Sequence, residues 1–439
     1  MNILKIFFKF YIILIFLLNT IYSQNQKDWT CAIYMEAGTQ NMSYWVNKNI
    51  NDMAAAKFDN KNLNILTQVH ITGDIVTRYN IFDGQIKQIE TLKFNQQPEQ
   101  NIIDFMQWIK NNYPAKHYAL ITSGHGFGIL DPKYQPTSTD EFAWDIEPDE
   151  PEFVCTDGIC PIKSFNNNLI SENLNHANHR GFMFNGFKTF INNAQMIYML
   201  KTIKEKVLDN NKLDILGTDC CKMSMLEIGY QIKDYVNYLV GSQNCELIDG
   251  WNYKDLFSCF NKDNITPIDA LSFITKTYSD YYQKNTKESI YTISAIDLSK
   301  IGKLVDNFND IIVTSKNLML NHKQEFIKLI FGARENTPNM CSSSYYRDLG
   351  SLYLNMLEEI SKRESAGLCS QCAKDLKKYL ITGLELIKDA VIFNVTGTTV
   401  ANMHGLAFYF PRNRIDASYL DTVFVKDTEW LNFLQNIIS

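Results

Sequence analysis

Two adjacent cysteines, Cys220 and Cys221, lie where an expected β-strand gives way to an expected helix. Residues 213–217 before them form a short apolar run with the length of a buried parallel strand, and apolar residues recur at helical spacing over 225–232 behind them. In open α/β sheets, reacting groups gather beyond the carboxyl ends of the strands. A thiol near a helix N-terminus also has its thiolate form favoured by the helix dipole. We therefore expect a nucleophilic cysteine in this turn, although a buried cysteine can also be a small apolar filler.

A histidine occupies the matching position after an earlier apolar run. Residues 117–122 predict a buried strand, which leads into Gly124-His125-Gly126. Glycines on both sides let the backbone approach a ligand closely and leave the imidazole uncovered. Nucleophilic catalysis by a thiol needs a base within hydrogen-bond reach, so His125 is the expected partner of the cysteine. The alternative is a loop histidine with a structural role.

The elements around these residues indicate an α/β fold. Strands are predicted at 29–36, 63–70 and 237–242, a hairpin with a turn at Asp83-Gly84 over 78–89, and helices at 42–55, 100–111 and 194–207. Strands that alternate with helices imply a parallel sheet covered on both faces.

The chain beyond residue 253 is mostly helical by pattern. Helices are predicted at 268–283, 299–318 and 345–362, with apolar runs at 291–296 and 406–410. We therefore expect a core over 28–253, which includes the segment 131–180, and a largely helical C-terminal part over 254–439 that packs on the core.

The order of the motifs resembles a known clan of enzymes. A His-Gly pair after one strand and Asp219-Cys220-Cys221-Lys222-Met223 after a later one are similar to the cysteine peptidases that include caspases, legumains and gingipains. The Asp-x-Cys-x-Met form, with Ser242 and Gly250-Trp251-x-Tyr253 following, resembles the clostripain family, and family-like stretches occur at 295–297 and 404–411. The resemblance covers about 29–411. It implies a caspase-like αβα sandwich with a mostly parallel central sheet, and the activity of a cysteine endopeptidase.

The resemblance also implies roles for individual residues. In the family pattern the nucleophile stands two residues after the aspartate and two before the methionine, which is Cys221 here; Cys220 takes a position usually held by alanine. His125 would handle the protons, and the backbone N–H groups of Gly126 and Cys221 would hold the oxyanion. We expect a structural role for His404.

Asp219 and Asp249 are the expected substrate-binding residues. In clostripain-like enzymes the aspartate at the position of Asp219 lies at the base of the primary specificity pocket and pairs with an Arg or Lys of the substrate, bidentately for Arg. Asp249, just before the Gly250-Trp251 motif, is a second carboxylate for this pocket. Asp219 could instead cap the helix that follows, a common role of an aspartate at such a turn. A pocket for aspartate would need arginines, and none adjoins the motif.

The N-terminus fits a secretory signal peptide over residues 1–23. Two lysines precede the apolar stretch 10–18, and a small residue precedes a polar segment. The stretch is short for a membrane span, which needs about 20 apolar residues, although an uncleaved anchor is the alternative. Export also agrees with three glycosylation sequons, at Asn41, Asn264 and Asn394. We expect a secreted, lumenal or vacuolar glycoprotein.

Segment 131–180 interrupts the regular pattern. It contains five of the ten prolines and a cluster of acidic residues. Relatives of this type are made as zymogens that cut themselves at basic residues, so the expected cleavage sites in this loop are Lys133, Lys163 and Arg180. The acidic side chains could also hold calcium through oxygen ligands. The metal site is unknown, and a solvated surface insertion is the alternative.

Composition sets the remaining limits. Hydrophobic residues make up 45% of the 439 residues, enough for a substantial core, and the net charge of -6 argues against a nucleic-acid partner. The ten cysteines suggest disulfides in an exported chain, and Cys369-x-x-Cys372 without a second such pair argues against zinc.

We predict a monomeric, secreted cysteine endopeptidase that cleaves peptides or proteins after Arg or Lys and needs no cofactor for its chemistry. One alternative is a catalytically silent relative that binds peptides through the same cleft. Another is a peptidase of this fold with legumain-like asparaginyl specificity.

Overall fold

The computed structural model describes most of the chain beyond its first 25 residues. The described ranges are 26–37, 40–71, 74–131, 134–136, 142–144, 182–185, 189–285, 289–340, 343–364 and 370–438. The predicted signal peptide and most of the predicted loop at 131–180, with Lys133, Lys163 and Arg180, lie outside these ranges.

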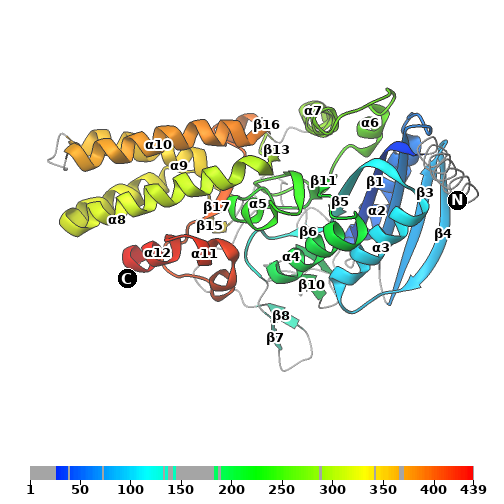
Figure 1. Cartoon of the computed structure of the whole chain (residues 1–439), viewed down its shortest axis with the longest axis horizontal. Helices are drawn as coiled ribbons and strands as arrows, with labels where there is room; N and C mark the ends of the chain where they lie inside the picture. Colours follow the sequence, from blue (N-terminus) through cyan, green and yellow to red (C-terminus); the bar gives the residue numbers. More distant parts are fainter. Residues whose placement is uncertain are drawn as a thin grey trace, which may run out of the picture.

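A nine-stranded sheet forms the centre of the molecule (Figure 1). In spatial order the strands are β16 (Val391–Thr396), β13 (Thr292–Asp297), β12 (Val236–Gly241), β11 (Leu213–Asp219), β5 (Ala115–Ser123), β1 (Lys27–Glu36), β2 (Leu63–His70), β3 (Ile75–Phe82) and β4 (Gln85–Lys93). The five strands from β12 to β2 are mutually parallel, and the two strands at each edge add antiparallel pairings. Seven of the nine strands, the central five with β4 and β16, therefore run in one direction, which confirms the predicted mostly parallel sheet.

The central strands are apolar runs buried on both faces, as parallel strands must be. All eight residues of β2 are buried. Along β1, Ala32 and Tyr34 belong to one hydrophobic core, whereas Cys31 and Ile33 belong to the other, because successive side chains of a strand point to opposite faces. The edge strand β4 is by contrast largely exposed.

Helices cover both faces of this sheet (Figure 1). The core on one face includes α2 (Gln40–Ala55), α6 (Tyr253–Ser258) and α7 (Pro267–Asn285). The core on the other face includes α3 (Pro98–Asn112), α4 (Asn193–Thr202) and α5 (Leu226–Ile232). The predicted αβα sandwich is confirmed. The helix predicted over 194–207 is α-helical only to Thr202 and continues as a π-helical turn, Ile203–Val207.

The predicted hairpin joins β3 to β4. Asp83 and Gly84 both have positive φ angles, 49° and 73°, as a two-residue turn of the primed type requires. The strands extend beyond the predicted 78–89 to Ile75 and Lys93.

The C-terminal part extends the molecule to one side as three long helices packed on one another (Figure 1). They are α8 (Leu298–Glu335), α9 (Leu349–Glu364) and α10 (Ser370–Ala390). Shorter elements accompany them: β14 (Asn339–Met340), β15 (Ser343–Asp348), β17 (Ala407–Tyr409), α11 (Val423–Asp427) and α12 (Trp430–Ile438). Because β13 and β16 complete the central sheet, this part of the chain also builds the core, in addition to supplying the expected helices.

One predicted helix is wrong at its start. Residues 345–348, expected to begin a helix, belong to β15, in which Tyr346 lies opposite Tyr409 of β17. Asp348 then ends the strand and begins α9, because its carboxylate accepts a hydrogen bond from the Ser351 N–H at 2.7 Å. Tyrosines favour strands when a partner strand is available, and this partner comes from a distant part of the sequence.

Small sheets lie beside the central one. β6 (His125–Gly126) pairs with β9 (Phe182–Asn185), which pairs with β10 (Thr189–Ile191). A ribbon of β7 (Tyr134–Pro136) and β8 (Phe142–Trp144) is the described part of the predicted 131–180 loop beyond Asp131. Among the described residues, no helix is long and apolar enough to cross a membrane.

Candidate active site

The predicted histidine and cysteine follow two strands that are neighbours in the sheet. β5 and β11 pair in parallel, with Ser123 opposite Asp219, so their carboxyl ends lie side by side. The Gly124 N–H donates to the Asp219 carbonyl at 3.3 Å and links the two chain segments just beyond the strands. The structure therefore brings together the segments that carry His125 and Cys221, at the sheet edge where α/β enzymes place reacting groups.

Gly126 is pressed against the cysteine turn. A Cβ atom at this position would lie 2.5 Å from the Cys221 carbonyl oxygen, 2.8 Å from the Cys220 Cβ and 3.1 Å from the Cys221 nitrogen. Real Cβ atoms do not approach backbone so closely, so only glycine fits here. The two main-chain segments whose N–H groups are the predicted oxyanion donors are thus in direct contact.

Cys221 is half-buried, and its sulfur faces the loop that follows β12. The Glu246 N–H lies 3.2 Å from the Cys221 Sγ, in position to donate a hydrogen bond to it. Burial raises the pKa of the Cys221 thiol to about 11, against the smaller lowering by this hydrogen bond. The expectation that a helix dipole favours the thiolate is wrong. The helix α5 begins only at Leu226, so Cys221 lies farther from its N-terminus than the single turn over which a helix dipole acts strongly.

His125 is also uncharged at neutral pH. Burial lowers the pKa of its imidazole to about 4, because the cationic form loses hydration. The pair at rest is therefore a neutral thiol with a neutral imidazole. An imidazole in this state can accept the thiol proton during attack and return it to a leaving amine.

Cys220, the neighbouring thiol, points into the core. It is fully buried, and its sulfur lies 3.4 Å from the Thr122 carbonyl oxygen. Burial raises its pKa well above the ordinary value. A thiol in this environment is a poor nucleophile, so the geometry favours Cys221 of the two.

Asp219 is the last residue of β11 and is 5% exposed. Burial raises the pKa of its carboxyl group to about 6, opposed by hydrogen bonds from Tyr253, the Trp251 backbone and Ser123. The Tyr253 hydroxyl donates to Asp219 Oδ2 at 2.8 Å. The alternative that Asp219 caps the following helix is excluded, because the N-cap residue of α5 is Met225.

The Gly250-Trp251-x-Tyr253 motif forms the surroundings of Asp219. Gly250 has a φ of 65°, and a Cβ there would lie 2.8 Å from Asp219 Oδ2, so the carboxylate depends on this glycine for space. Asp249, the second predicted carboxylate, is half-buried, and its Oδ2 accepts a hydrogen bond from the Tyr281 hydroxyl at 2.5 Å. The motif therefore adjoins both predicted substrate-binding aspartates: Gly250 packs against Asp219 at the end of β11, and Asp249 directly precedes Gly250 in the chain.

The sequence reasoning missed Glu246. This residue is 8% exposed, and its N–H contacts the Cys221 sulfur. Burial, and to a smaller extent the nearby Asp219 carboxylate, raises the pKa of the Glu246 carboxyl group well above its usual value, against the lowering by the Tyr278 hydroxyl. A glutamate in a loop between a strand and the Gly250 motif gives no periodic signal. Its neighbour Cys245 is disulfide-bonded, which agrees with an exported chain.

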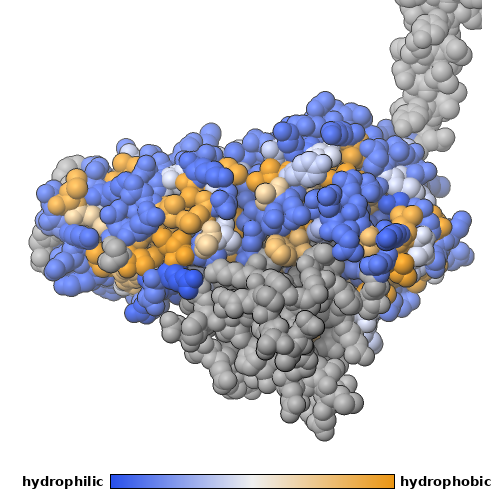
Figure 2. Space-filling model, turned by 90° about the horizontal axis from the view of Figure 1, so that it is seen from below, coloured by the Kyte–Doolittle hydropathy of each residue, from blue (hydrophilic) through white to orange (hydrophobic). Residues whose placement is uncertain are grey.

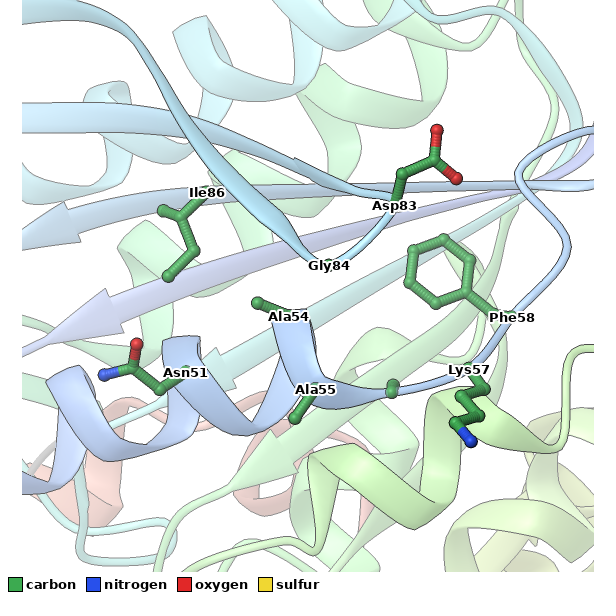
Figure 3. A pocket seen from close by; sticks show the side chains of 9 residues that line it. Asn51, Ala54, Ala55, Lys57, Phe58, Asp83, Gly84 and Ile86 are labelled. Carbon is green, nitrogen blue, oxygen red and sulfur yellow. The ribbon is translucent and has the colours of Figure 1, made fainter.

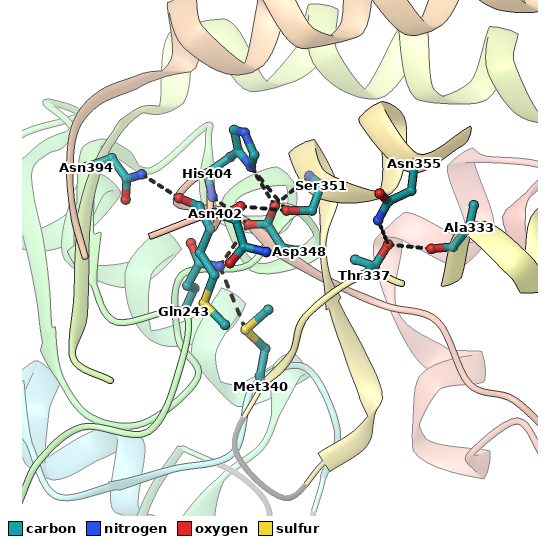
Figure 4. Close-up of polar contacts among 11 residues, drawn as sticks. Gln243, Ala333, Thr337, Met340, Asp348, Ser351, Asn355, Asn394, Asn402 and His404 are labelled. Carbon is teal, nitrogen blue, oxygen red and sulfur yellow. Dashed lines mark hydrogen bonds and ion pairs between the residues drawn. The ribbon is translucent and has the colours of Figure 1, made fainter. Parts of the chain in front are cut away.

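His404 lies in a separate polar cluster (Figure 4). Its Nδ1 is 2.9 Å from Asp348 Oδ1, and this hydrogen bond raises the pKa of the imidazole. Asp348 also accepts from the His404 N–H at 2.8 Å and from the Gln243 side chain at 2.9 Å. These contacts tie β15 and the segment before β17 to the loop after β12, and so are structural.

A surface hollow of about 660 Å³ lies elsewhere, between the end of α2 and the β3–β4 turn (Figure 3). Its lining includes Ala54, Phe58 and Gly84. Because α2 runs back from the carboxyl end of β1, this hollow lies at the opposite edge of the sheet from Cys221. Within the described part of the chain, no group of three or more His, Cys, Asp or Glu side chains is placed to hold a metal ion.

An αβα sandwich with a histidine and a cysteine after adjacent parallel strands is the arrangement of a caspase-like cysteine peptidase. The chain matches the model of the clostripain family over residues 33–155 and 184–435, and it belongs to that family of cysteine peptidases. No curated protein matches the sequence.

Solved structures share the fold. One is a secreted C11 cysteine protease from Bacteroides thetaiotaomicron in complex with an irreversible peptide inhibitor, with a TM-score of 0.59 and 16% identity over 92% of this chain and 99% of that one. Another is an inactive zymogen of a C11 protease from Parabacteroides distasonis, with a TM-score of 0.54 and 16% identity over 92% of this chain and 98% of that one. The match to the family model confirms the predicted family and the predicted class of enzyme, and the solved structures share the fold.

Proposed function

We propose that this peptidase is a secreted endopeptidase that cleaves after Arg or Lys by means of a Cys221–His125 dyad. The observation that carries the specificity is the buried carboxylate of Asp219, two residues before the nucleophile and enclosed by the Gly250 motif. A buried negative charge without a cationic partner among the described residues favours a substrate that brings one.

The chemistry follows from the neutral resting pair. Cys221 Sγ attacks the scissile carbonyl carbon while its proton passes to His125, and the backbone N–H groups of Gly126 and Cys221 hold the developing oxyanion. His125 then protonates the leaving amine, and the carbon–nitrogen bond breaks to leave a thioester. Water, deprotonated by His125, attacks the thioester, and the thiol leaves with the proton returned to it.

Activation is part of the proposal. A zymogen is the state of the Parabacteroides distasonis neighbour, and a basic-specific enzyme could cut its own loop over 131–180 at Lys133, Lys163 or Arg180. Calcium bound by the acidic residues of this loop would order it, with no part in the bond-breaking step. Secretion is supported by the signal-like N-terminus and by the disulfide at Cys245.

A panel of fluorogenic peptides tests this function. Peptides that differ only in Arg, Lys, Asn or Asp before the scissile bond are assayed with calcium and with a chelator. Hydrolysis after Arg and Lys supports the proposal. Hydrolysis after Asn would instead indicate legumain-like specificity, and no hydrolysis by folded, processed protein would indicate a silent peptide-binding relative.

A further inference from the structure

Glu246 lies directly against the nucleophile. Its loop runs along the cysteine turn, where the Lys222 N–H donates to the Asn244 carbonyl at 2.8 Å and the Glu246 N–H lies 3.2 Å from Cys221 Sγ. The side chain is 8% exposed. The backbone of Glu246 therefore borders the position at which Cys221 would attack a substrate carbonyl carbon.

The Glu246 carboxylate has two buried oxygens that lack a hydrogen-bond partner of normal geometry among the described residues. The Tyr278 hydroxyl, which likewise lacks such a partner, lies close enough to lower the pKa of the carboxyl group. Buried polar groups are nearly always satisfied, so such a group indicates a missing partner. Glu227, another buried glutamate, is unsatisfied only at Oε2: its Oε1 accepts from the Tyr409 N–H at 2.7 Å and from the Tyr419 hydroxyl at 3.1 Å.

The Asp219 carboxylate has more hydrogen-bond donors around it than the Glu246 carboxylate does. The Tyr253 hydroxyl, the Trp251 backbone and Ser123 all hydrogen-bond its carboxylate. A guanidinium binds a carboxylate best through two parallel N–H···O bonds, which need two free oxygens on one group. Only Glu246 of the two offers them, while Asp219 contributes a second negative charge close by.

We propose that Glu246 is the residue that distinguishes Arg from Lys: its two oxygens receive the guanidinium of the substrate Arg, and Asp219 supplies the second charge. The inference rests on the proposed cleavage after basic residues and adds the residue that makes the bidentate contact. A Lys ammonium is a point donor that cannot make a fork, so the preference for Arg should depend on Glu246.

Glu246→Gln tests the proposal, because it keeps the shape and one acceptor but removes the charge and the second acceptor. We measure kcat/KM for matched peptides with Arg, Lys and the neutral isostere citrulline before the scissile bond. The Arg value should fall about 30-fold or more, the Lys value should fall less, and the citrulline value should stay within about twofold. The rate of Cys221 alkylation by iodoacetamide should change little, which separates specificity from damage to the nucleophile.

Glu227→Gln is the matched control, since it changes a buried glutamate whose hydrogen-bond partners are Tyr409 and Tyr419 of the C-terminal part. It should leave the ratio of Arg to Lys cleavage unchanged. If Glu246→Gln does not fold, wild-type enzyme decides: butylguanidine should inhibit competitively at concentrations at least about tenfold lower than butylamine.

Several outcomes overturn the proposal. An unchanged Arg-to-Lys ratio in folded Glu246→Gln, or equal inhibition by butylguanidine and butylamine, removes Glu246 from substrate recognition. A variant whose calcium dependence changes while this ratio stays constant would place an inorganic cation at Glu246 instead. A wild-type enzyme that cleaves after neither Arg nor Lys contradicts the proposed function itself, a result that the wild-type panel detects before any variant is made.

Discussion

Replacing Asp219 by asparagine should separate the function of this buried carboxylate from its effect on stability. Asparagine keeps the size of the side chain, and its carbonyl oxygen can still accept the hydrogen bond of the Tyr253 hydroxyl, which is 2.8 Å long in the wild type. The substitution therefore removes the charge with little change in shape. Gly250, against which the carboxylate packs, needs no adjustment.

The expected loss of activity follows from leaving a cation unpaired in a buried site. A hydrogen bond to a charged group contributes about 1.5–3 kcal/mol, and an unpaired charge adds its own desolvation cost. We expect kcat/KM for Arg and Lys substrates to fall by at least about 2 kcal/mol, or about 30-fold. A citrulline substrate should be cleaved at nearly the wild-type rate.

The effect on stability has the opposite sign. Burial raises the pKa of Asp219 from 3.8 to about 6, so the folded protein binds this proton more tightly than the unfolded chain does. Stability from this group is fully present below about pH 4 and is lost as pH rises to about 6. At pH 7.5 the ionised carboxylate thus destabilises the folded state by about 3 kcal/mol, on the scale of 1.36 kcal/mol per pKa unit. The asparagine variant lacks this penalty.

Urea unfolding of wild type and variant at pH 4 and at pH 7.5 measures the difference, with disulfides intact. Relative to the wild type, the free energy of unfolding of the variant should rise from pH 4 to pH 7.5. The variant should at the same time lose cleavage after basic residues. Other buried carboxyl groups titrate in both proteins and cancel in the comparison, except Glu246, whose pKa is raised by the Asp219 charge. Loss of that charge adds to the relative stability of the variant at pH 7.5. Refutation would come from a variant that is less stable at pH 7.5 than at pH 4 relative to wild type, or from equal losses with Arg and citrulline substrates.

Three further results are expected. Cys221→Ala should abolish hydrolysis, whereas Cys220→Ala should retain most of it because that thiol faces Thr122 in the core; equal losses in two folded variants would contradict the assignment. Alkylation of Cys221 by iodoacetamide should keep accelerating up to about pH 10, since burial raises the pKa of the thiol to about 11; a plateau already reached at pH 6 would indicate a thiolate–imidazolium pair instead. Incubation with calcium should split the chain within 131–180, but not in Cys221→Ala; a fully active, uncut chain would rule out self-processing.

The sequence was sufficient to predict the sandwich and the neighbouring positions of the two motifs. Apolar runs before His125 and Cys221 each have the length of a buried strand, and consecutive parallel strands place their carboxyl ends at one edge. The start of α9 could not be predicted in this way. Tyr346 forms a strand because Tyr409 lies opposite it, and that pairing depends on the tertiary fold.

The protonation state of Cys221 could not be predicted from the local sequence for a related reason. A cysteine between a strand and a helical pattern indicates a dipole-stabilised thiolate, but the helix begins at Leu226 and the turn is enclosed by the Glu246 loop. Burial by segments far apart in the chain raises the pKa of the Cys221 thiol, and this effect outweighs any stabilisation of the thiolate by the helix.

This burial has a consequence for catalysis. A neutral thiol and a neutral imidazole have no strong mutual attraction that a substrate would have to disrupt. In the proposed mechanism, the charge separation would develop only when the thiol proton moves to His125 during attack. The carboxyl groups of Asp219 and Glu246 lie close together in the same enclosed region and are the proposed partners of the substrate cation. A bound basic side chain would supply that positive charge next to Cys221 and favour formation of its thiolate. Substrate charge would therefore contribute to activating the nucleophile as well as to binding, so that truncating the basic side chain should lower kcat and not only raise KM.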